Sequence, residues 1–274
     1  MATKINKLLQ TSPQGTVILA SWLSDNGYSY DLQQHYLKSQ WLEAVGRGAF
    51  KRTGDKTNIF GALYALQTQA GKKIHVGGPS SLSLQGFAHY VEMQETKTVL
   101  FTHAGTKLPA WFLKNDEYIS PQVIKTSFLP MNAGLVSYRA NGFSVNISGA
   151  ARAMLECLEM APKKFDLNEA LLIMEGLTAL RPDQVQTLLG QCRSIKAKRL
   201  FLYLAEKSGH AWFKYLDSSK IDLGSGKRSI VKPRLPYQTS ATHLHKKGDG
   251  PIVEEDDFRL QTINLFSLAK PQRD

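Results

Sequence analysis

Two short motifs in the 274-residue sequence carry residues that could bind a phosphate group or a metal ion. Residues 224–227, Gly-Ser-Gly-Lys, resemble part of a phosphate loop. The complete motif needs a glycine where Ile221 stands and a serine or threonine where Arg228 stands. We interpret the run as a turn with solvated cations. His243 and His245 have no cysteine and no third ligand nearby, so they are interpreted as solvated loop residues.

Residues 95–97, Glu-x-Lys, could be half of a metal-dependent nuclease site. Such a site needs a second carboxylate, and no Asp or Glu lies between Asp55 and Glu92. Ser148 lacks the glycine two places earlier that a nucleophile elbow requires. The sequence therefore predicts no catalytic residue, no metal ligand and no cofactor, and the protein is not expected to be an enzyme.

A set of polar and basic residues near the N-terminus suits DNA instead. Glutamine amides can donate and accept in the paired way that adenine requires, whereas tyrosine and lysine suit phosphate or sugar contacts. Arg47 stands between two glycines, where its guanidinium could enter a narrow minor groove. The sequence does not decide which of these residues reads bases. The predicted DNA-binding residues are Ser29, Tyr30, Gln33, Gln34, Lys38, Arg47, Lys51 and Arg52.

Two helices are predicted before this set. Apolar residues at helical spacing predict a short first helix that stops at a turn over residues 12–15. Thr16 is expected to cap a second helix, which runs through the apolar residues 18–23. The Asn26-Gly27 pair is expected to end it, because this pair is favoured at helix C-termini.

A third helix is expected to carry the first five residues of the set. Ser29 can act as its N-cap, and Leu32 and Tyr36, one turn apart, are expected to pack inward. The outer face would then be centred near Gln34 with Gln33 at its flank, and it would be polar without being acidic.

A hairpin is expected to carry the other three residues. Residues 41–52 place two short apolar strands around a Gly-Arg-Gly turn, which is typical of a two-stranded wing. Three helices followed by such a hairpin predict a winged helix-turn-helix over residues 1–56. A protein-protein adaptor could have the same elements, because fold does not fix function.

The rest of the chain predicts a larger domain over residues 57–232, so that the fold class is α+β. A helix is expected over residues 59–69. Strands in a mainly antiparallel sheet are expected at residues 72–78, 88–93, 98–103, 110–114, 123–129, 135–140 and 143–148. Four helices are expected at residues 150–160, 167–177, 182–191 and 195–207. Residues 233–274, rich in proline, glycine and acidic residues, predict a mobile tail.

Charge and composition limit the class of partner. The formal net charge of +11 favours a polyanion, which could be DNA, RNA or an anionic membrane surface. Cys157 and Cys192 are too few for a disulfide framework and are expected to be reduced core thiols. The sequence has neither the apolar core of a signal peptide nor the ~18-residue apolar run of a membrane helix, so a cytoplasmic location is expected.

Four segments together resemble the AbiEi family of antitoxins from type IV toxin-antitoxin systems. They are SQWLEAVGRGAFKR, FGALYALQTQ, IHVGGPSSLSLQGFAHY and WFKYLDSSKIDLGSGKRSIVK, and the similarity covers most of residues 12–232. The positions that match the family around the recognition helix and the wing are Leu32, Tyr36, Lys38, Ser39, Gly46, Arg47 and Gly48. The chain departs from the family pattern after about residue 232, which puts in doubt whether it keeps antitoxin activity.

The resemblance implies a winged helix-turn-helix that binds double-stranded DNA at inverted repeats upstream of its own operon and represses transcription. It also implies a C-terminal domain with antitoxin activity against a nucleotidyltransferase-like toxin, whose direct contact with the antitoxin is expected only weakly. The alternative is an interaction protein that restrains a toxin through protein or RNA contacts without binding operator DNA.

Overall fold

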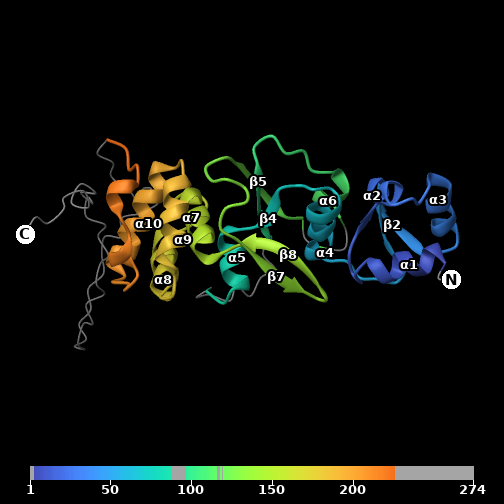
Figure 1. Ribbon diagram of the computed structural model, residues 1–274, viewed down its shortest axis with the longest axis horizontal. Helices are drawn as coiled ribbons and strands as arrows, with labels where there is room; N and C mark the ends of the chain where they lie inside the picture. The colour runs from blue at the N-terminus through green and yellow to red at the C-terminus, as the bar shows by residue number, and fades with distance from the viewer. Residues whose placement is uncertain (1–2, 88–96, 116–117, 119, 226–274) are drawn as a thin grey trace, which may run out of the picture. The chain divides into compact units, whose positions relative to one another are not determined.

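The computed structural model describes residues 3–87, 97–115, 118 and 120–225 (Figure 1). Residues 1–223 form one compact unit. The strand predicted at residues 88–93 and the tail predicted over residues 233–274 lie outside the described residues. No described helix is long and apolar enough to cross a membrane.

The N-terminal module has the element order of a winged helix-turn-helix. Its helices are α1 (Lys4–Thr11), α2 (Ala20–Asp25) and α3 (Tyr30–Lys38), and its strands are β1 (Ile18–Leu19), β2 (Leu42–Gly46) and β3 (Ala49–Arg52). The strands form an antiparallel sheet in the order β1-β3-β2. The predicted first and third helices and the predicted hairpin are confirmed.

The prediction for the start of the second helix is wrong. Ile18 and Leu19 form β1, where they pair with Phe50 and Ala49 of β3, so α2 begins only at Ala20. The hydroxyl of Thr16 donates to the carbonyl of Pro13 at 2.6 Å and caps no helix. The edge of β3 gives these two apolar residues backbone hydrogen-bond partners and also buries their side chains. The helical spacing of the apolar residues could not indicate this strand pairing.

A small core fills this module. Leu8 of α1, Ile18 of β1, Leu23 of α2 and Phe50 of β3 are buried against one another, with Tyr36 of α3 beside them. Every helix of the module contributes its inner face, so α3 is held from behind by apolar packing.

The larger part contains a five-stranded sheet. Its strands are β4 (Ile74–Val76), β5 (Val99–His103), β6 (Gln122–Thr126), β7 (Leu135–Ala140) and β8 (Phe143–Ser148), in the order β6-β5-β4-β8-β7. The sheet is mixed rather than mainly antiparallel as predicted, because β4–β5 and β7–β8 are antiparallel whereas β4–β8 and β5–β6 are parallel. The strand predicted at residues 110–114 is also wrong, because that segment forms the helix α6 (Ala110–Leu113) after Pro109.

Helices complete the described chain. The segment after the wing forms α4 (Ile59–Tyr64) and continues as the π-helix η1 (Ala65–Gln69), and α5 (Gly78–Leu84) follows β4. The four helices predicted after the sheet are confirmed as α7 (Ala150–Met160), α8 (Leu167–Gly176), α9 (Pro182–Gln191) and α10 (Ile195–Lys207). Two short 3-10 turns, η2 (Phe213–Tyr215) and η3 (Ser218–Lys220), come last.

Glu156 of α7 ties the sheet to the helices. Its Oε1 accepts hydrogen bonds from His75 and Arg152, both at 2.9 Å, and its Oε2 accepts from Ser148 and from the backbone of Gly78. Burial by itself raises the pKa of Glu156, but the hydrogen bonds from His75 and Ser148 and the charges of His75 and Arg152 outweigh it and lower the pKa. This carboxylate is therefore an ionised structural centre.

The N-terminal module and the larger part share one hydrophobic core. Val17, Leu19 and Ala49 pack in the same buried cluster as residues of α4, β4 and β8. Gly61 of α4 lies so close to the preceding loop that a Cβ there would meet the carbonyl oxygen of Gly15 at 2.0 Å. Gln69 adds two hydrogen bonds, because its amide accepts from the backbone of Leu19 and donates to that of Val17. The module is therefore packed directly against the larger part.

Candidate nucleic-acid interface

The helix α3 is defined by signals at both of its ends. The hydroxyl of Ser29 accepts from the backbone N–H of Leu32 at 3.4 Å, as predicted. Asp31 in the first turn and Lys38 in the last turn complement the helix dipole. Gln40, with φ of 57°, then reverses the chain into β2. This nine-residue helix is the element that could enter a major groove.

The outer face of α3 carries four polar side chains. Asp31, His35 and Lys38 are exposed, and Gln34 is half-buried among them. Tyr30, at the start of the helix, is 71% exposed. The face is centred between Asp31 and Lys38, whose opposite charges balance, so it is polar without being acidic, as predicted.

Gln33 does not flank this face, which corrects the sequence prediction. Its side chain is 2% exposed, and its Nε2 donates to the carbonyls of Tyr28 and Ala20 and to the hydroxyl of Ser24. Because these acceptors belong to α2 and to the turn that follows it, Gln33 fixes α3 onto α2 and cannot reach a base edge.

The wing is short and supported at its tip. A Cβ on Gly46 would lie 2.6 Å from the Cβ of Trp111 in α6, so this glycine serves close packing rather than the approach of DNA. Gly48 has a left-handed φ of 74° with open space around it, and its carbonyl accepts from the backbone of Ala20 at 3.0 Å. Arg47 between them is exposed, as predicted.

Lys51 is buried in the module and Arg52 is half-buried, and both side chains contact other residues of the module. Lys51 is 7% exposed, and its Nζ lies 3.7 Å from the carboxylate of Glu43, its cross-strand partner. A guanidinium nitrogen of Arg52 donates to the carbonyls of Leu9 and Ser12, where α1 ends. The prediction that both residues contact phosphates therefore does not agree with their positions.

Three further residues of the interface were missed by the sequence analysis. His35 is on the outer face of α3. Leu32, Tyr36 and Leu37 together define the inner face, and a sequence analysis that counted Leu37 with the other two would have placed His35 on the outer face. Trp41, after α3, is 47% exposed. The ammonium of Lys4 donates to the carbonyl of Gly27 in the turn before α3, a contact for which the sequence gives no signal.

The electrostatics of the module are simple. Burial raises the pKa of Tyr28, and burial together with the neighbouring Tyr28 raises the pKa of Tyr36. Both phenols therefore stay neutral and act as packing groups.

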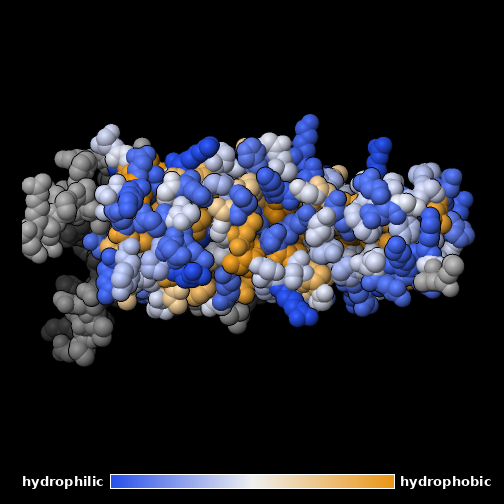
Figure 2. All heavy atoms as spheres, in the orientation of Figure 1, coloured by the Kyte–Doolittle hydropathy of each residue, from blue (hydrophilic) through white to orange (hydrophobic). Residues whose placement is uncertain are grey.

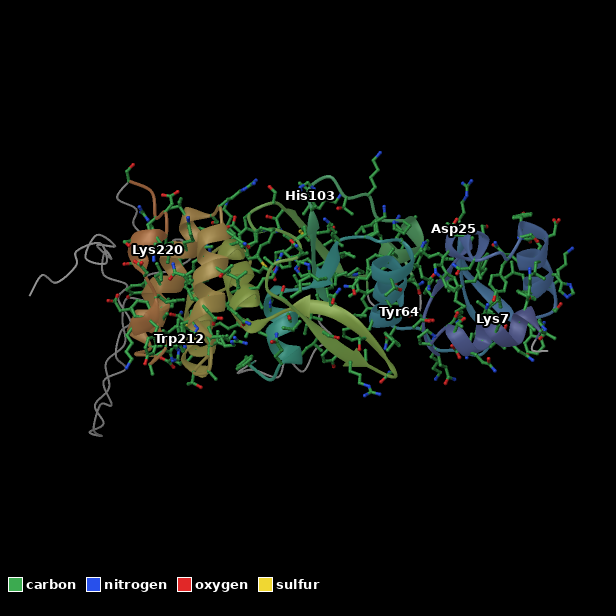
Figure 3. The ribbon with its side chains drawn as sticks, in the orientation of Figure 1. Lys7, Asp25, Tyr64, His103, Trp212 and Lys220 are labelled. Atoms are coloured by element: carbon green, nitrogen blue, oxygen red, sulfur yellow. The ribbon has the colours of Figure 1, made fainter. Side chains whose placement is uncertain are left out.

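Figure 2 shows mostly hydrophilic residues on the face of the module in view, and Figure 3 places Lys7 and Asp25 on it. Among the described residues, no three His, Cys, Asp or Glu side chains are grouped to hold a metal ion.

Two family models match the chain. One, described as the N-terminal domain of the AbiEi antitoxin transcriptional regulator, matches residues 1–93. The other, described as a transcriptional regulator, AbiEi antitoxin of a type IV toxin-antitoxin system, matches residues 95–239. No protein of curated function matches the sequence significantly.

The fold is similar to that of a solved structure, the RV2827C protein from Mycobacterium tuberculosis. The two chains superpose with a TM-score of 0.51 at 14% identity, over 84% of this chain and 87% of the other. At this identity the likeness concerns the fold alone, and it extends through both the N-terminal module and the larger part.

Proposed function

The chain belongs to the AbiEi family of antitoxin transcriptional regulators of type IV toxin-antitoxin systems, and we propose that it represses its own operon by binding inverted repeats upstream of it. The observation that carries this proposal is the exposed polar face of α3, which is capped by Ser29 and backed by the core of the module. An α-helix such as α3 is about 10–12 Å across with its side chains and fits a major groove about 12 Å wide.

The side chains on α3 suit base readout. The amide of Gln34 can pair with adenine, and Asp31 can accept from the amino group of cytosine. Lys38 and Lys4, at opposite ends of α3, suit phosphates on either side of the groove. Arg47, at the tip of the wing, is the side chain proposed to enter the neighbouring minor groove.

We assign the antitoxin activity to the larger part of the chain, which the second family model matches. We propose that it counteracts a nucleotidyltransferase-like toxin without depending on a stable complex with it. One observation favours the alternative, an interaction module that binds protein or RNA instead of operator DNA. Lys51 and Arg52 are committed to contacts within the module, so the interface has fewer free cations than the sequence indicated.

The test is binding of the purified protein to about 200 base pairs from upstream of its gene and to scrambled DNA over a salt series. We expect preference for the upstream DNA. Arg47→Ala should weaken the affinity for the upstream DNA at least about tenfold and reduce the salt slope by about one unit. Arg139→Ala, which removes an exposed charge from β7, should leave this affinity unchanged. Equal, weak binding to both DNAs would reject the repressor and favour the interaction module.

A further inference from the structure

We propose that an open recess beside the sheet binds a nucleoside triphosphate. The recess has a volume of about 860 Å³, within the range of roughly 300–1,000 Å³ that is usual for small-ligand sites. Its walls come from three separate segments, residues 71–73 before β4, residues 103–107 after β5 and residues 130–132 before β7.

The lining of the recess is rich in basic residues. Lys72, Lys73 and Lys107 line the recess together with His103, which Figure 3 labels at the end of β5. None of the described residues that line it is acidic, and within the described chain no carboxylate forms an ion pair with the three lysines. Three ammonium groups that have no counter-ion among the described residues suit a triphosphate, because charge-assisted hydrogen bonds to phosphate oxygens are strong.

Other residues of the lining suit a nucleobase. Pro130 and Met131 offer apolar surface, and the amide of Asn132 beside them can both donate and accept. Gly105 and Gly71 leave the main chain open to a ligand, because a Cβ on Gly105 would meet only His103 at 3.8 Å and one on Gly71 would meet nothing. Phosphates and base therefore have separate partners in one recess.

Hydrogen bonds hold two of the three walls, the segments at residues 71–73 and 130–132. The hydroxyl of Thr102 donates to the carbonyl of Lys73 at 2.9 Å, and the buried Arg152 donates to that of Pro130 at 2.7 Å. The backbone of Lys72 donates to the carbonyl of Leu66 in η1, the π-helix that leads into the recess. π-helical turns are frequent at functional sites, and a recess that is already ordered needs little rearrangement to bind.

DNA is the other polyanion within reach. A second hollow of about 340 Å³ shares Lys72 and Lys107 with the recess and is also lined by Gly48 of the wing. A nucleotide is favoured because a sugar-phosphate backbone would leave the apolar wall and the amide of Asn132 unused. The test is therefore done on protein free of DNA.

The experiment is titration calorimetry of the full chain with ATP and GTP, with tripolyphosphate and adenosine as partial ligands. We expect saturable binding of at least one nucleotide, weaker binding of tripolyphosphate, and a loss of affinity of about tenfold or more in the double variant Lys72→Ala/Lys107→Ala. The double variant Lys163→Ala/Lys164→Ala removes the same charge from an exposed turn and should bind like the native protein.

A second variant keeps every charge. Gly105→Leu narrows the recess at a position without left-handed backbone, so it should fold and weaken nucleotide binding by about tenfold or more. Absence of saturable heat up to about 5 mM nucleotide, or equal weakening by both double variants, would overturn the proposal. In a separate DNA titration, a loss of DNA affinity in Lys72→Ala/Lys107→Ala, together with no nucleotide binding, would also overturn it. Since no DNA is present in the calorimetric titration, a negative result for nucleotide binding does not bear on the proposal that the protein binds operator DNA.

Discussion

The Nε atom of Arg152 donates a hydrogen bond to Oε1 of Glu156 at 2.9 Å, one turn apart on α7, and the two side chains are 1% and 0% exposed. The same guanidinium donates from Nη1 to the carbonyls of Pro130 and Ala133, ahead of β7. Together with His75 of β4, the pair connects a helix, a sheet and a loop that are far apart in the sequence.

Removing the carboxylate should destabilise the fold strongly. Glu156→Gln leaves Arg152 buried without its charge partner and turns an amide group toward the donors Ser148 and Gly78. We expect a loss of about 3–5 kcal/mol in the free energy of unfolding, measured by urea denaturation at pH 7. Glu175→Gln on the exposed side of α8 is the control and should change little. Equal stability of the two variants would contradict this role.

The same carboxylate should make stability depend on acid pH. The pKa of Glu156 is lowered in the folded protein, so the unfolded chain binds a proton more readily. The stabilisation is complete above the unfolded pKa of about 4.3 and is lost as the pH falls through the folded pKa. The measurement is the urea midpoint of the native protein and of Glu156→Gln from pH 7 to pH 3. The difference between the two midpoints should become smaller below about pH 4. A constant difference would exclude this linkage.

Gln69 should stabilise the attachment of the N-terminal module. Its Oε1 lies 2.7 Å from the backbone N of Leu19 and its Nε2 lies 3.0 Å from the carbonyl of Val17. Gln69→Ala leaves both backbone groups unpaired, and we expect a loss of about 1–3 kcal/mol in a urea denaturation. Gln191→Ala, at an exposed position of α9, should cost much less. A neutral Gln69→Ala would mean that water replaces these bonds.

Gln33 and Gln34 should behave oppositely although they are adjacent. Gln33→Ala should lower the free energy of unfolding by about 1–3 kcal/mol, because it leaves buried carbonyls unpaired, and should leave the operator affinity of the folded protein unchanged. Gln34→Ala should keep stability and weaken operator binding by about 1–3 kcal/mol. Denaturation and DNA titration of both variants measure this, and weaker DNA binding by a fully stable Gln33→Ala would show that Gln33 reaches the DNA.

Substitution by alanine should change the stability of the protein in opposite directions at two glycines. Gly46→Ala places a Cβ against Trp111, so we expect it to destabilise the protein by about 1–3 kcal/mol. Gly190→Ala, in α9 with nothing within 4 Å, should stabilise it by up to about 1 kcal/mol. Thermal unfolding of both variants is the measurement, and an unaffected Gly46→Ala would mean that the wing is not held by α6.

The sequence by itself determined the parts of this protein that depend on near neighbours along the chain. Periodic apolar residues placed the helices α7 to α10, and the Ser29 cap placed α3. The Gly-Arg-Gly turn placed the hairpin, because a tight turn fixes which residues pair across it. The exposed positions of Tyr30, Lys38 and Arg47 followed from the same local patterns.

Only the tertiary structure decided which partner each element and each polar side chain has. The parallel pairing of β4 with β8 joins residues about 70 positions apart, and no local pattern specifies it. Gln33, Lys51 and Arg52 look like interface residues until the carbonyls of α1 and α2 and the carboxylate of Glu43 are placed beside them. A buried polar group must find a partner, and where that partner lies is set by the packing of distant segments.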